Sequence, residues 1–396
     1  NLDSMNVSAA SLESGAGRLT FTGQAGPRKI DGRAQLSIPE LNQFSSLTKR
    51  DLRGALTLAV AIAGSPREGR VSAVLDGGVK DPRLGVPALD GLLGGKASVK
   101  GVVATDDGGV RFDRLSIAGA HVDALLDGKA TNDLANLKIA VDAPDLAKAD
   151  ARLKGRAHAD IALAGALKKL DATFAARVQD AAAIGRPIPH LALTGAARDV
   201  TGVSASIEGI IDGKPARGAL RANRAGQNWS LDTLDLSVGK AQAAGALILD
   251  KDMLARGRVR IAAPDLDDLS AFALQKLSGR LDADVTFEND SGGQTIRVEA
   301  HGAGLRAADA TLDRLDAQIS ARDVYRRPAL EGQAAADGLR VAGQAISRAR
   351  LLAKPDANGA TALDLSIAAR DYELTARGTL NASDPLRLDI AQFSAN

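Results

Sequence analysis

The chain of 396 residues contains no cysteine, and aromatic residues make up only 3% of it. The absence of cysteine excludes disulfides and thiolate metal sites. A closed β-sandwich fills its core with aromatic and branched side chains, so this low aromatic content leaves room for an open or ligand-filled interior. No stretch approaches the roughly 20 apolar residues that a transmembrane helix requires.

The chain also lacks clusters of like charge: its 50 basic and 48 acidic residues are scattered along the sequence. Without a basic stripe, a nucleic-acid partner is not expected. The four histidines, His121, His158, His190 and His301, lack the close spacing of metal ligands. Gly15-Ala16-Gly17 lacks the third glycine of a dinucleotide-binding loop. We therefore expect no catalytic residues, no bound metal and no cofactor.

The dominant pattern in the chain is an alternation of apolar residues with small or polar ones. Leu56, Leu58, Val60 and Ile62 alternate with alanine and threonine, which places the large side chains on one face of a strand. The same period returns at residues 234–238, 281–287, 296–300, 363–367, 372–376 and 386–390. The pattern predicts sheets with one apolar and one wet face.

Pairs such as Asp-Gly and Asn-Gly tolerate the positive φ of tight turns and predict hairpins between sequence neighbours. They occur at Asp76-Gly77-Gly78, Asp107-Gly108-Gly109, Asp127-Gly128, Asp212-Gly213, Ser291-Gly292-Gly293 and Asn358-Gly359. Helical spacing is confined to residues 266–273 and, more weakly, 41–47. The sequence therefore predicts a mainly β protein, an elongated repetitive antiparallel sheet with a few short helices and under about a fifth helix.

One six-residue phrase containing Pro, an acidic residue and Leu occurs three times, beginning near residues 36, 141 and 261. Each copy is followed by a Leu-x-Gly, at Leu52, Leu153 and Leu277. Units that recur with variable length indicate an imperfect array of stacked elements. No linker or composition shift interrupts the chain, so we expect residues 1–396 to form one continuous array and to be an internal piece of a longer protein.

Several phrases together resemble the TamB family, the inner-membrane subunit of the translocation and assembly module. They lie at residues 184–191, 212–216, 231–236, 265–270, 277–285 and 323–328. The resemblance is to the TamB-like proteins of alphaproteobacteria, and it is strongest from about residue 180 to the end. The resemblance rests on the order and spacing of these phrases together.

The resemblance implies an AsmA-like β-taco, an elongated sheet curved into an open groove whose apolar face carries phospholipids. It also implies a location in the periplasm of a Gram-negative bacterium, with an anchor in the inner membrane outside this chain. An outer-membrane barrel partner of the TamA type would be engaged through other parts of the protein. The expected function is phospholipid transport between the membranes, in outer-membrane biogenesis. The alternative is a scaffold for outer-membrane protein (autotransporter) assembly and protein secretion.

Transport along such a groove requires apolar contact rather than catalysis, because burying a lipid tail is favourable by about 0.8 kcal/mol per methylene. A closed groove, in which the same residues form an ordinary core, and a secreted β-solenoid adhesin are the other interpretations. The residues expected to contact phospholipid acyl chains are the larger members of the alternating sets: Leu56, Leu58, Val60, Ile62, Val285, Phe287, Leu363, Leu365, Ile367, Leu386, Leu388 and Ile390.

Overall fold

Strands contain 76% of the residues and helices 7%, in one antiparallel sheet of 25 strands that is not closed on itself. This computed structural model describes residues 5–45, 51–106, 108–199, 201–290, 293–326, 328–341, 343–355, 360–381 and 387–395. The predicted fold class, a repetitive antiparallel β protein with a few short helices, is confirmed.

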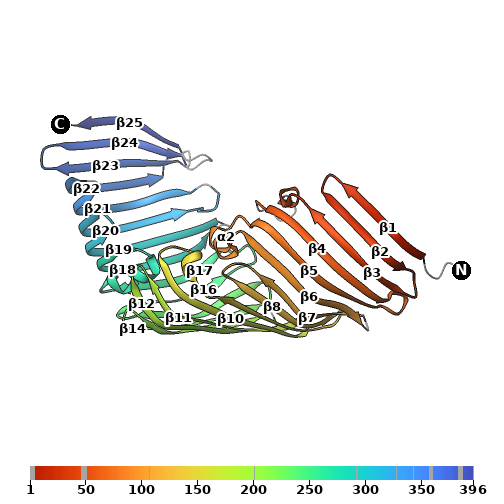
Figure 1. The fold of residues 1–396 in the computed structure, drawn as a ribbon. Helices are drawn as coiled ribbons and strands as arrows, with labels where there is room; N and C mark the ends of the chain where they lie inside the picture. Colours follow the sequence, from red (N-terminus) through yellow and green to blue (C-terminus); the bar gives the residue numbers. More distant parts are fainter. Residues whose placement is uncertain are drawn as a thin grey trace. The chain divides into compact units, whose positions relative to one another are not determined.

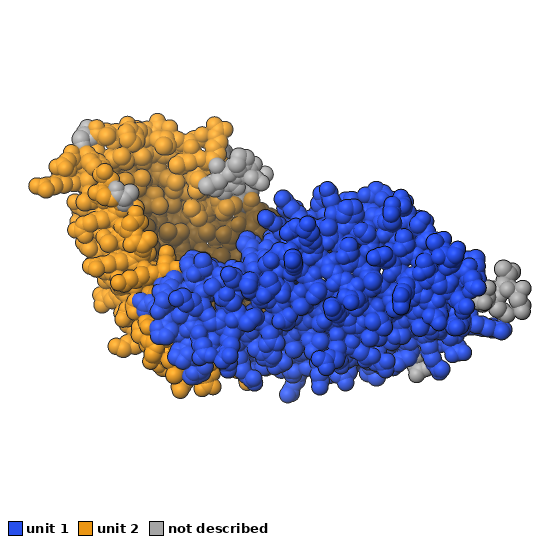
Figure 2. Space-filling model, in the orientation of Figure 1, with its two compact units in different colours: residues 1–200 blue, residues 201–396 orange. Residues whose placement is uncertain are grey.

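The chain divides into two compact units, residues 1–200 and residues 201–396 (Figure 2). In unit 1 each strand pairs antiparallel with the next in sequence (Figure 1). Its strands are β1 (Met5–Ser14), β2 (Gly17–Ala25), β3 (Ile30–Ile38), β4 (Arg53–Ser65), β5 (Arg70–Arg83), β6 (Lys96–Asp106), β7 (Gly109–Ala118), β8 (Asp123–Thr131), β9 (Leu134–Ala143), β10 (Leu153–Ala166), β11 (Lys169–Ala183) and β12 (Arg186–Arg198).

Unit 2 follows the same rule from β13 to β25. Its strands are β13 (Gly202–Ile211), β14 (Lys214–Ala225), β15 (Asn228–Val238), β16 (Ala241–Leu249), β17 (Ala255–Ala263), β18 (Leu277–Asp290), β19 (Gly293–Ala307), β20 (Ala310–Arg322), β21 (Ala329–Val341), β22 (Gln344–Pro355), β23 (Thr361–Ala369), β24 (Glu373–Asn381) and β25 (Arg387–Ala395).

Helices are short and connect consecutive strands. Within the described residues they are η1 (Leu41–Phe44), η2 (Pro66–Glu68), α2 (Pro87–Leu93), η3 (Leu146–Lys148), η4 (Leu266–Leu269) and α3 (Ser270–Ala273). The three repeated phrases each lead into one of them: η1, η3 and η4 begin at the leucine that closes the phrase. The short helices expected near residues 41–47 and 266–273 are therefore present in the described part of each segment, and residues 46–50 lie outside it.

The Leu-x-Gly that follows each phrase marks an irregularity in strand pairing. Gly54, Gly155 and Gly279 have φ of 118°, 100° and 100°, and the register shifts at each of them. A bulge of this kind places one extra residue in the strand and bends it. The repeat detected in the sequence is thus a unit made of a short helix, a bulge and the strand that follows.

Two of the predicted turns are wrong. Asp76-Gly77-Gly78 lies inside β5 and Asp127-Gly128 inside β8. Gly77 pairs with Leu58 and Gly128 with Phe112, both large residues of the preceding strand. A Cβ at Gly77 would approach the Thr57 carbonyl and the Leu58 side chain, and a Cβ at Gly128 would approach the backbone of Asn136 and Leu137, so close packing within the sheet accounts for both glycines.

The remaining turn predictions differ in outcome. Asp212-Gly213 joins β13 to β14 and is confirmed, and Gly108 lies between β6 and β7. Asp107, Ser291-Gly292 and Asn358-Gly359 lie outside the described residues.

Most strands have no second layer packed on them. The chain exposes 23811 Å², whereas a compact monomer of its mass exposes roughly 15,000 Å². Fully buried apolar residues are few, and many of them are alanines. One such cluster joins Ala241, Ala263 and Leu266, with Leu269 and Leu281 against it. The protein is therefore stabilised mainly by cross-strand contacts.

Candidate functional site

In unit 1 the four candidates Leu56, Leu58, Val60 and Ile62 lie on one face of β4. All four are half-buried, while the three residues between them are exposed. Strand pairing carries this face across the unit from β3 to β12. One row contains Leu36, Leu58, Gly77, Val99, Ile117, Ala124, Val141, Ala159, Ala176 and Leu193.

In unit 2 one apolar row reaches every strand from β13 to β25. It contains Ala205, Leu220, Leu234, Gly245, Val259, Val285, Val298, Ile319, Gly332, Ala353, Leu363, Gly378 and Ile390. Three of the predicted contact residues, Val285, Leu363 and Ile390, therefore lie in a single row. The pattern of the sequence predicted the face but not this alignment, which depends on register.

The other unit 2 candidates share this face. Phe287 pairs with Ile296, and Leu365 and Ile367 pair with Leu351 and Ala349. Leu388 and Ile390 lie on β25 and are 55% and 60% exposed. Leu386 lies outside the described residues.

A row of small side chains runs beside the larger ones. Ala283, Ala300, Ala317 and Ala334 pair in sequence across β18, β19, β20 and β21. Val285, Val298 and Ile319 flank this row on one side, and Leu281 and Leu315 on the other. By strand register, these four methyl groups lie between a line of branched side chains and a second line in which Gly302 separates Leu281 from Leu315. We call this row of small side chains, perpendicular to the strands, the trough. With about 4.8 Å between strands, its described length is about 14 Å.

The trough leads to an apolar cavity. Ala283 pairs with Ile261, which lines a cavity of about 250 Å³. Its other apolar lining residues are Ile207, Ala216, Leu236, Val238, Ala241, Ala243, Leu269 and Phe272. Leu269 and Phe272 come from η4 and α3, so these helices cover one side of the cavity. An apolar cavity of about 150 Å³ can stay dry and bind benzene, so this one has room for a hydrocarbon group.

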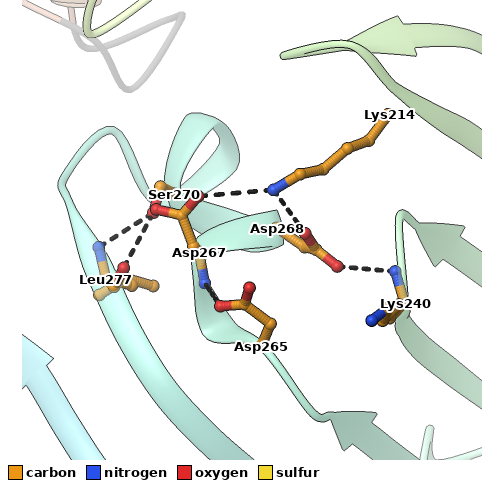
Figure 3. A network of polar contacts seen from close by, with 7 residues as sticks. All are labelled: Lys214, Lys240, Asp265, Asp267, Asp268, Ser270 and Leu277. Atoms are coloured by element: carbon orange, nitrogen blue, oxygen red, sulfur yellow. Dashed lines mark hydrogen bonds and ion pairs between the residues drawn. The ribbon is translucent and has the colours of Figure 1, made fainter.

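We call residues 266–273 the plug, because they cover this part of the apolar face. An ion pair attaches the plug to the β13–β14 hairpin (Figure 3). Asp268, only 5% exposed, accepts from Lys214 Nζ at 2.7 Å and from the Lys240 backbone N–H at 2.6 Å. Burial raises the pKa of Asp268, but the hydrogen bonds from Lys214, Lys240 and Ala241 outweigh it and leave the pKa lowered. The buried carboxylate therefore remains charged.

A second set of bonds fixes the ends of the plug. Asp265 Oδ1 accepts from the Asp267 N–H at 3.0 Å and caps η4. The Ser270 hydroxyl accepts from the Leu277 N–H at 2.9 Å, so the plug is tied to the start of β18 (Figure 3). The first repeat has the same bond, from the Leu52 N–H to the Ser45 hydroxyl at 3.0 Å. The first and third repeats share this serine, seven residues before the leucine, whereas the second repeat has Leu146 at that position. Sequence reasoning missed the serine, although its spacing to the following leucine was visible.

The opposite face carries exposed ion pairs. Examples are Arg377 with Asp364 at 2.7 Å and Arg322 with Glu331 at 2.8 Å. Exposed pairs of this kind contribute little stability but keep the face wet. In the part of the chain that the structure describes, no cluster of three His, Asp or Glu is arranged to hold a metal ion. Among the same residues, no helix is long and apolar enough to cross a membrane.

Comparisons with models of known protein families, with curated proteins and with solved structures give no significant match.

Proposed function

We propose that the apolar sheet face binds lipid acyl chains and that the chain is part of a hydrophobic conduit for phospholipids. The observation that carries the proposal is the row that extends from Ala205 to Ile390 without a polar side chain. Because the sheet is mostly a single layer, this row is not consumed by packing against a second sheet. An acyl chain would cover it and would be held by about 0.8 kcal/mol per buried methylene.

The alanine trough gives the tail a path. A tail lying over Ala283, Ala300, Ala317 and Ala334 would contact branched side chains on both sides and the sheet beneath. Adjacent positions along the trough are chemically alike, so a tail can move from strand to strand with little change in binding free energy. The cavity beneath Leu269 and Phe272 would hold the end of a tail more completely.

This proposal agrees with the resemblance to TamB-like proteins, and with it come the periplasmic location, the anchor in the inner membrane and the role in outer-membrane biogenesis. The outer-membrane partner belongs to the same proposal. These parts derive from the resemblance and not from the geometry.

The test uses two variants: one places a carboxylate in the apolar row, and the other places it at the next residue, on the opposite face. Val285 lies between Val259 and Val298, whereas its neighbour Thr286 lies on the other face between Arg258 and Arg297. Val285→Glu should reduce binding of a fluorescent phospholipid roughly tenfold or more, since it puts a carboxylate against the tail. Thr286→Glu adds the same charge to the wet face and should bind as the unmodified chain does.

Circular dichroism must show that both variants retain their strand content. Equal lipid binding by the two folded variants would refute the conduit. The alternative function, in which the sheet edge receives extended polypeptides, uses backbone hydrogen bonds rather than the Val285 side chain. It therefore predicts that neither variant loses binding to an extended peptide.

A further inference from the structure

The apolar cavity under the plug differs from the trough because it has a floor and a cover. Three alanines of the sheet, Ala216, Ala241 and Ala243, form the floor, and Ala216 and Ala241 are 1% and 2% exposed. Leu269 and Phe272 line the cavity from the plug. Since each alanine contributes only a methyl group, the side chains of the floor do not fill the space beneath the plug.

Two branched side chains close the cavity on the side of β13. Gly218 pairs with Ile207 on β13 and with Leu236 on β15. A Cβ at Gly218 would collide with the side chains of both residues, so both lie over this glycine. On the side of β17, Ile261 lines the cavity and pairs with Ala283 of the trough. The cavity is therefore closed at β13 and continues into the trough at β17.

Hydrogen bonds and an ion pair hold the cover in place (Figure 3). Asp268 accepts from Lys214 Nζ at 2.7 Å and from the Lys240 N–H at 2.6 Å, and the Ser270 hydroxyl accepts from the Leu277 N–H at 2.9 Å. These contacts keep the plug from collapsing onto the alanines. The cavity is thus formed before a ligand arrives, which lowers the entropy lost on binding.

The lining of the cavity favours hydrocarbon. Its polar lining residues are Arg217, Ser237 and Gln242, and each follows an apolar lining residue on its strand. Because side chains alternate between the faces of a strand, these three point to the opposite, wet face. A polar group of a ligand would lose water in the cavity without gaining a hydrogen-bond partner.

The size of the cavity limits how much of a tail it can hold. Its volume is about 250 Å³, and a cavity of about 150 Å³ binds the six carbons of benzene, so about ten carbons fit in proportion. Phe272 and Leu236 are 51% and 41% exposed, which leaves the cavity open beside them. A longer chain can enter with its end and keep the remainder outside.

We propose that this cavity binds the terminal segment of one straight acyl chain, about ten carbons long. The inference rests on the proposed function, in which the trough delivers the tail to the cavity. Along the trough a tail meets similar positions and can move between strands. In the cavity its end meets the closed side formed by Ile207 and Leu236. The cavity is therefore a resting site on the conduit, with a limit on chain length that the trough does not have.

Isothermal titration with hexanol, octanol, decanol and dodecanol tests the proposal. Each added methylene should tighten binding about fourfold up to decanol, because each one is buried in the cavity. The gain from decanol to dodecanol should be smaller, since the added carbons lie outside. The absence of saturable decanol binding would overturn the site. An undiminished gain through dodecanol would overturn the limit on length.

A variant that fills the cavity provides the second measurement. Ala243→Leu should weaken decanol binding roughly ten- to a hundred-fold, because the larger side chain occupies space that the alcohol needs. The matched control is Ala349→Leu. Ala349 is also half-buried, pairs with Ile367 on the apolar face and does not line the cavity. Equal decanol binding by the two folded variants would overturn the proposal.

A change in the cover keeps the test valid if Ala243→Leu does not fold. Phe272 is half exposed, so its replacement leaves the sheet intact. Phe272→Ala should weaken decanol binding roughly tenfold, and Phe272→Leu should restore most of the loss, since leucine again covers the alcohol. Equal binding by these two variants would show that the plug does not contact the ligand and would overturn the proposal.

The conduit and the cavity can fail separately. Val285 does not line the cavity, so Val285→Glu should lose phospholipid binding and retain decanol binding. If Val285→Glu and Thr286→Glu bind phospholipid equally while Ala243→Leu loses decanol, the conduit is refuted and the cavity remains a hydrocarbon site. If those two glutamate variants differ as expected and no alcohol binds, the conduit stands and the cavity proposal is overturned.

Discussion

Gln294 is 1% exposed and uses its side-chain amide as an extra backbone unit. Its Oε1 accepts from the Ala255 N–H at 2.6 Å, and its Nε2 donates to the Ala255 carbonyl at 3.1 Å. The same Nε2 lies 3.0 Å from the Glu288 carbonyl. The side chain thus satisfies polar groups at the beginning of β17 that the neighbouring strand leaves without a partner.

Replacing Gln294 by Leu should destabilise unit 2 by about 1–3 kcal/mol, because buried backbone groups lose their partners. Urea unfolding measures the loss, and amide hydrogen exchange at Ala255 locates it. Gln35→Leu serves as the control, since Gln35 is exposed on β3. Equal unfolding midpoints for the two variants would show that the hydrogen bonds of Gln294 do not stabilise unit 2.

His158 gives unit 1 a dependence on pH. Its Nδ1 lies 2.7 Å from Asp142 and its Nε2 lies 3.0 Å from Asp160, and these hydrogen bonds raise its pKa above 6.5. Since the folded pKa is the higher one, the stabilisation is fully present below about pH 6.5 and is lost as the pH rises through the folded value. Asp142→Asn should return the pKa towards its ordinary value in an NMR titration. An unmodified chain whose His158 titrates at 6.5 would contradict this.

At the scale of elements, a substitution at the bulge glycine of the third repeat tests whether the bulge is needed for stability. Gly279 has φ of 100°, and a Cβ there would lie 2.4 Å from the Gly304 carbonyl oxygen. Gly279→Ala should therefore cost about 2–4 kcal/mol, because strain and a backbone clash act together. Gly213, with φ of 74° in a turn, has nothing within 4 Å of an added Cβ. Gly213→Ala should cost only about 1 kcal/mol. Thermal unfolding of the two variants compares them directly.

The elements were largely predictable because their signals are local. Alternation at residues 56–62 or 363–367 fixes a strand and its apolar face without knowledge of its neighbours. The turn predicted at Asp76-Gly77-Gly78 was wrong because a glycine also occurs inside a strand opposite a large residue, here Leu58. That cross-strand neighbour cannot be read from the local sequence. The plug was expected as helix, but its attachment through Lys214 and Asp268 joins residues far apart in sequence. The alanine trough likewise depends on register.

Over the whole molecule, an apolar face of this extent without a second layer is the property that most needs explanation. A closed core buries its rows on both sides, and a single-layer sheet leaves one side of each row to another molecule. The plug covers this face around Leu266 and Leu281. A closed core and an open lipid-binding face therefore predict different losses of stability when a charge is placed at a position away from the plug.

Introducing an arginine at two positions on this face distinguishes the closed core from the open face. Leu365 lies in the middle of β23, away from the plug, where the arginine of Leu365→Arg can extend its charged end to water. We expect this variant to remain soluble and folded and to bind less lipid. Leu281 packs against the buried cluster under the plug, so Leu281→Arg should bury an unpaired charge and cost several kcal/mol. Circular dichroism and urea unfolding compare the two. If Leu365→Arg unfolds as readily as Leu281→Arg, the face is closed at β23 and the conduit does not pass there.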